Sequence, residues 1–108
     1  MSKTTIRIKT RSSTDLFLPA NILDGGLVAV HSFVLNTAGS VRKGWYTVTH
    51  VPTGKSIVAE VRGRERAIHC AGLVNLPCLK NESFRPIPKD LKRALSKVDR
   101  YLKETARL

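Results

Sequence analysis

The polar and apolar positions of residues 3–11 alternate, which is the pattern of a half-buried β-strand. Arg7 and Lys9 fall on one face of this strand, whereas Ile6 and Ile8 fall on the other. We therefore predict a first strand whose outer face is basic.

The segments that follow suggest one long strand between two loops. Residues 27–36 (LVAVHSFVLN) are long and rich in β-formers, which predicts a central strand. Before it, residues 15–26 contain a proline and a pair of glycines, and we predict a loop there with one short helical turn. After it, residues 37–44 (TAGSVRKG) read as a polar loop that carries Arg42 and Lys43.

Residues 45–51 and 55–62 are both strand-like, and the Pro-Thr-Gly at 52–54 suits a three-residue hairpin loop. The tetrapeptide TGKS at 53–56 also matches the end of a phosphate-binding P-loop. However, the first glycine of that motif falls on Thr49, and the residues after the lysine alternate like a strand instead of forming a helix. We therefore predict a hairpin and no P-loop.

This hairpin predicts which side chains share a face. If Val51 lies opposite Lys55, then Trp45 shares a face with Val61, and Tyr46 lies on the opposite face with His50. The Trp45 face resembles a core side because large aromatic residues are usually buried. We expect the Tyr46 face to be mixed and solvent-exposed, which makes Tyr46 a candidate for base stacking.

Two helices are predicted after the hairpin. Apolar residues recur at helical spacing over about 64–76, until Pro77 ends the helix. Residues 77–86 form a linker, and a second helix is predicted over about 88–107, beginning with a proline in its first turn. Its apolar seam consists of Leu91, Leu95, Val98 and Leu102.

Strands grouped before helices are typical of the α+β class. We predict a single domain over residues 1–108, with an antiparallel sheet of about four strands and two C-terminal helices packed on one face. The other sheet face would be open or buried in a homodimer.

The net charge points to an anionic partner. The 108 residues include 19 Lys and Arg against 8 Asp and Glu, a formal net charge of +11. Such an excess attracts nucleic-acid backbones, and we predict binding to DNA or RNA, with strand number left open. The alternatives are a small basic inhibitor or adaptor that docks on an acidic protein, and a plain solvated surface.

The strand–helix junction at Arg62, Arg64 and Arg66 is the most specific candidate, because a helix N-terminus and arginines both bind phosphate. The predicted nucleic-acid contacts are Arg62, Arg64, Arg66, Arg42, Lys43, Arg7, Lys9 and Tyr46. A second basic surface is predicted on the last helix at Lys89, Arg93, Lys97 and Arg100, although these residues also fit an ordinary solvated helix face.

Other chemistry is poorly supported. Cys70 and Cys78 lack the spacing of a zinc site, and His69 points about 100° away from the adjacent Cys70 on a helix. We expect no enzyme, metal or cofactor. The sequence also shows no membrane-length apolar run and no signal-peptide pattern in its first thirteen residues, and two cysteines make no disulfide framework. These features predict a cytoplasmic protein.

Overall fold

The computed structural model describes residues 1–10, 14–36, 38–80 and 87–106. Among these residues, five strands form one antiparallel sheet in the order β1-β2-β3-β4-β5. The class is α+β, as predicted, with one strand more than expected. The strands are β1 (Ser2–Lys9), β2 (Asp15–Ile22), β3 (Val28–Val34), β4 (Val41–His50) and β5 (Ser56–Arg62).

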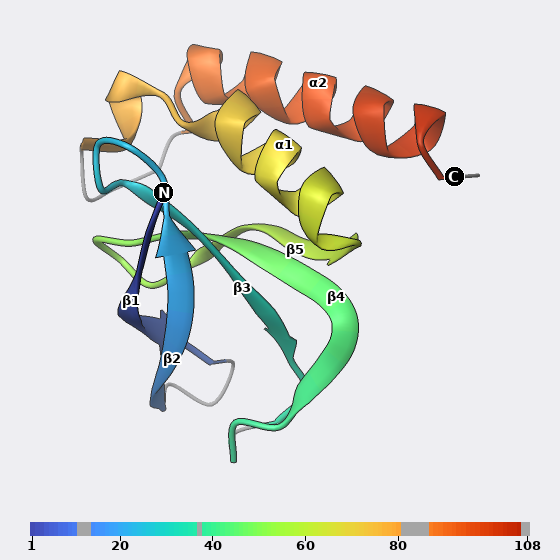
Figure 1. The fold of residues 1–108 in the computed structure, drawn as a ribbon. Helices are drawn as coiled ribbons and strands as arrows, with labels where there is room; N and C mark the ends of the chain where they lie inside the picture. The colour runs from blue at the N-terminus through green and yellow to red at the C-terminus, as the bar shows by residue number, and fades with distance from the viewer. Residues whose placement is uncertain (11–13, 37, 81–86, 107–108) are drawn as a thin grey trace.

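Both helices lie on one side of the sheet, as predicted (Figure 1). Helix α1 (Arg64–Val74) packs on β3, β4 and β5, and α2 (Lys89–Glu104) packs on α1. A 3-10 helix at Pro77–Lys80 occupies the start of the predicted linker, and residues 81–86 of that linker lie outside the described residues. Each α-helix ends before its predicted limit, the first at Val74 and the second at Glu104.

The extra strand, β2, corrects the predicted loop with a helical turn at 15–26. It pairs along its whole length with β1, from Lys9 opposite Asp15 to Ser2 opposite Ile22. Its pairing with β3 is limited to Asn21 and Ile22. Pro19 precedes this short paired stretch, so its missing N–H interrupts no ladder on the β3 side. The proline is therefore compatible with a strand.

The predicted core face of the β4–β5 hairpin is wrong. Val48 pairs with Val58 as expected, but Tyr46 lies opposite Val61 because the register shifts between these two pairs. Val48 and Val61 are buried under α1, and Tyr46 packs against the same core. Since α1 begins directly after β5, it covers the face on which Val61 lies. Trp45 consequently faces away from the helices.

His50, predicted on the solvent-exposed face, is also buried. Its Nε2 lies 2.7 Å from the carbonyl oxygen of Leu79, and its Nδ1 lies 2.8 Å from Oγ1 of Thr53. The imidazole thus joins the end of β4 to the 3-10 helix.

The face away from the helices is only partly open, because the sheet curls. The backbone N–H of Lys9 donates a hydrogen bond to the carbonyl of Gly54, 3.0 Å away, which brings β1 against the turn between β4 and β5. A second core of buried residues forms inside this curl. It consists of Ile6, Ile8, Ala20 and Ala29. The alternation predicted for β1 is confirmed, with Ile6 and Ile8 buried and Arg7 and Lys9 exposed.

Candidate nucleic-acid interface

The structure brings the predicted Arg62 junction together with Arg42 and Lys43. Arg62 pairs with Trp45 across β4 and β5, and the N–H of Gly63 donates to the carbonyl of Gly44 at 2.9 Å. The predicted polar loop at 37–44 is wrong at its end, because β4 begins at Val41 and holds both residues. The β3–β4 register shifts between Ser32 and Phe33, so residues 43–45 have no β3 partner.

Helix α1 begins without a side-chain cap. Gly63 occupies the N-cap position with φ of +91°, and no side chain of the described residues caps the first turn with a hydrogen bond. Arg62 and Arg64 are exposed on either side of this glycine, with Glu65 as the acidic residue of the first turn. An uncapped helix N-terminus between two arginines can hold an anion.

Arg66 faces a different environment from its two neighbours. All three guanidinium nitrogens donate to protein oxygens: Nε to Oγ1 of Thr105 at 2.8 Å, Nη1 to the carbonyl of Arg62 at 2.9 Å and Nη2 to the carbonyl of Leu102 at 3.1 Å. A cation at the end of α2 also complements that helix's dipole. Arg66 therefore links the β5–α1 junction to the C-terminal end of α2.

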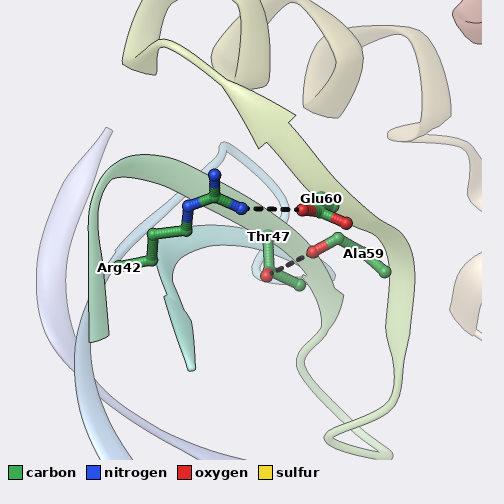
Figure 2. Close-up of polar contacts among 4 residues, drawn as sticks. All are labelled: Arg42, Thr47, Ala59 and Glu60. Atoms are coloured by element: carbon green, nitrogen blue, oxygen red, sulfur yellow. Dashed lines mark hydrogen bonds and ion pairs between the residues drawn. The ribbon is translucent and has the colours of Figure 1, made fainter. Parts of the chain in front are cut away.

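Arg42 lies over the ring of Trp45, with its Cζ 4.1 Å from the ring centroid. Its Nη1 lies 3.3 Å from Oε1 of Glu60 (Figure 2), in an ion pair whose side chains are 48% and 47% exposed. Beside it, Oγ1 of Thr47 donates to the carbonyl of Ala59 at 2.7 Å, as Figure 2 also shows. An ion pair this exposed contributes little to stability, so a phosphate can replace Glu60.

Arg7 and Lys9 do not join this cluster. Nη2 of Arg7 lies 3.5 Å from the carbonyl of Pro52, and Lys9 bonds to Gly54 through its backbone. They therefore lie with the exposed Lys55 at the far end of β5, about 20 Å from Arg62 for a strand of this length. The basic residues predicted to contact nucleic acid therefore form two clusters.

The TGKS tetrapeptide forms a turn, as predicted. Gly54 has a φ of +73° and β5 begins at Ser56, so a strand and not a helix follows the lysine. This arrangement lacks the helix N-terminus of a P-loop.

Tyr46 is half-buried and packs against the core beneath α1, so it lies on the helix side of the sheet. Trp45 and Phe33 are also half-buried and lie on the side of the sheet away from the helices. The prediction that Trp45 lies on the core side of the hairpin is wrong because α1 covers the opposite face of β4. The register shift in β5 that decides this has no clear signal in the sequence.

The second basic surface lies on α2, where Lys89, Arg93, Lys97 and Arg100 are all exposed. They lie away from the helix's buried residues, Leu91, Ala94 and Val98. None of the four cations has an ion-pair partner within the described residues.

The described residues contain no group of three or more His, Cys, Asp or Glu that could hold a metal ion. Burial raises the pKa of the Cys70 thiol, which opposes formation of a nucleophilic thiolate. The His69 ring stacks on Tyr101 with centroids 4.0 Å apart. Within the described part of the chain, no helix combines the length and apolar character that crossing a membrane requires.

In comparisons with protein-family models, curated proteins and solved structures, nothing matches this chain.

Proposed function

We propose that this protein is a non-enzymatic nucleic-acid-binding protein that contacts phosphates of DNA or RNA with little sequence specificity. The observation that carries the proposal is the hydrogen bond between Gly63 and Gly44, which places Lys43 beside Arg62 and Arg64 at the start of α1. These cations belong to a chain whose formal net charge is +11.

The electrostatics of this junction favour a bound anion. Within the described residues, Lys43, Arg62 and Arg64 have no ion-pair partner. Their positive charges lie at a helix N-terminus, where they oppose the dipole of α1. A phosphate group relieves that repulsion and accepts hydrogen bonds from the uncapped N–H groups and from the arginine forks.

Contacts of this kind hold the nucleic-acid backbone but do not read its bases. We therefore expect similar affinities for different sequences of one nucleic-acid type. Arg42 extends the phosphate-binding surface once it leaves Glu60, and the exposed cations of α2 provide a second, weaker surface.

The test is a titration of the purified protein into labelled single-stranded DNA, duplex DNA and RNA at several salt concentrations. The logarithm of the binding constant should fall linearly with the logarithm of salt, by about 0.7–0.9 per neutralised phosphate. Absence of binding to all three at low salt would overturn the proposal. A pull-down from lysate, with nuclease treatment, would then test the alternative of an acidic protein partner.

We also infer a cytoplasmic location from the two free cysteines, Cys70 and Cys78, which suit a reducing compartment. Fractionation of cells that express a tagged chain tests this location. Sedimentation of the free protein tests whether it forms a homodimer.

A further inference from the structure

The curled sheet encloses a groove of about 530 Å³ on the side away from the helices. Ile8 of β1, His31 and Phe33 of β3, Thr47 and Thr49 of β4 and Ala59 of β5 are among its lining residues. Its volume lies within the range of about 300–1,000 Å³ that is usual for sites that hold small organic groups.

The floor of the groove is uncharged. Nδ1 of His31 lies 2.8 Å from the carbonyl of Ser32, which can only accept, so Nδ1 carries the proton. Nε2 then accepts from the hydroxyl of Thr49, 2.6 Å away. Burial lowers the pKa of His31, which keeps this imidazole neutral. The floor therefore suits an apolar or aromatic group with few hydrogen bonds.

Basic residues lie at both ends of the groove. Lys9 is among the lining residues, with its side chain on the outer face of β1 opposite Ile8, and none of the described lining residues is acidic. At one end, Lys9 lies by the turn that carries the exposed Lys55. Toward the other end, Phe33 is the cross-strand partner of Arg42, and Ala59 lies three residues before Arg62. The groove thus connects the two basic clusters described above.

Aromatic surface continues from the groove to its rim. Phe33 lines the groove, its neighbour Arg42 covers the ring of Trp45, and all three lie on the side of the sheet away from the helices. An aromatic ring and a guanidinium plane both stack on nucleobases, whatever the base. In a duplex the bases are stacked inside the helix and cannot reach such a groove.

We propose that this groove binds the unpaired bases of single-stranded nucleic acid, with Phe33 and Trp45 as stacking platforms and the two basic clusters holding the phosphates on either side. The inference rests on the proposed nucleic-acid binding and specifies its strand type. Single-stranded DNA and RNA share the chemistry that the groove recognises, a planar base next to a phosphate.

The first experiment compares four probes of about 15 nucleotides at one salt concentration: oligo-dT, oligo-U, a DNA duplex and an abasic deoxyribose-phosphate chain. The abasic chain carries the same charge as oligo-dT but no base. We expect oligo-dT or oligo-U to bind at least about fivefold more tightly than the abasic chain, as one or more stacked bases predict. The tighter binder of the two shows whether the protein prefers this DNA or this RNA.

A matched pair of variants locates the bases. Phe33→Leu removes the ring in the groove, whereas Phe17→Leu makes the same change on an exposed residue (68% exposed) of the outer face. Phe33→Leu should weaken oligonucleotide binding at least about fivefold and leave binding of the abasic chain unchanged, while Phe17→Leu changes neither. Thermal unfolding of both variants shows whether each is folded.

Trp45 is the single tryptophan of the chain, so tryptophan fluorescence reports on this residue alone. Its fluorescence should change more when oligo-dT binds than when the abasic chain binds, because the abasic chain can draw Arg42 from the ring but cannot stack on it. Equal affinity for the abasic chain, the duplex and the single strands would overturn the groove inference and leave phosphate binding intact. Failure to bind any of the four probes would overturn the proposed function as well.

Discussion

The Nε–H of Arg66, in the first turn of α1, donates a hydrogen bond to Oγ1 of Thr105 at the end of α2, 2.8 Å away. The same guanidinium reaches the carbonyls of Arg62 and Leu102, so one side chain connects β5, α1 and α2. It lies two residues from Arg64, whose side chain is exposed. Two neighbouring arginines of the same basic cluster therefore have different expected roles.

Substitution of Arg66 should affect stability, and substitution of Arg64 should affect binding. Arg66→Ala removes three charge-assisted hydrogen bonds and should lower the free energy of unfolding by about 1.5–3 kcal/mol. Arg64→Ala should change it by less than about 0.5 kcal/mol. Urea unfolding of the two variants measures both values. Equal stability of the two variants would contradict the structural role of Arg66.

The double substitution Arg62→Ala with Arg64→Ala tests which basic surface binds phosphate. If these residues neutralise two phosphates, the slope of the logarithm of the binding constant against the logarithm of salt should become shallower by about 1.4–1.8. The control is Lys97→Ala with Arg100→Ala on α2, which removes the same charge from an exposed surface. If the slope becomes shallower by more in the α2 variant, then α2, and not the α1 junction, provides the main contact surface.

Parts of the fold follow from local patterns in the sequence. The alternation of Ile6 and Ile8 with Arg7 and Lys9 predicts the two faces of β1 correctly, because a strand has a fixed two-residue period. The turn at Gly54 follows from its turn residues in the same way. By contrast, β2 contains Pro19, which suggests a loop until the limited pairing of β2 with β3 is known.

The candidate site depends on relationships that the local pattern does not contain. That Arg42 and Lys43 lie near Arg62 was predictable from the hairpin alone. That Trp45 and not Tyr46 lies on the side of the sheet away from the helices depends on a one-residue register shift in β5, which inverts the faces of the strand. The separation of Arg7 and Lys9 from Arg62 depends on the curl of the sheet, and the contacts of Arg66 depend on where α2 ends.

Gly54 should be intolerant of any side chain, because β1 packs against it. A Cβ at this position would lie 2.9 Å from the carbonyl oxygen of Arg7 and 3.2 Å from the backbone nitrogen of Lys9. Gly39 provides the matched control, with a similar positive φ of +88° but no atom within 4 Å of a Cβ. Gly39→Ala should lower the free energy of unfolding by about 1–2 kcal/mol because of the backbone conformation alone.

Gly54→Ala should lower the free energy of unfolding by at least about 1 kcal/mol more than Gly39→Ala does, because β1 must also shift. Chemical denaturation gives both values, and equal costs would show that β1 does not pack on the turn. The same shift would open the groove near Lys9, so oligonucleotide affinity should fall in the Gly54 variant more than in the Gly39 variant.

Stability should fall in acid through His31. Burial lowers the pKa of this histidine in the folded protein below the value of about 6.5 that it has in an unfolded chain. Between the two values the unfolded chain binds the additional proton, so the free energy of unfolding decreases as the pH falls below about 6.5 and levels off below the folded pKa. Protonation of Nε2 would also break its hydrogen bond from Thr49.

His31→Gln removes this titration, and His69→Gln is the control because His69 is exposed. The loss of stability between about pH 7 and pH 5 should be smaller in the His31 variant than in the original chain, and unchanged in the His69 variant. Urea unfolding at a series of pH values measures each slope. A pH dependence that survives in His31→Gln would mean that other groups cause it, and the neutral floor of the groove would lose its support.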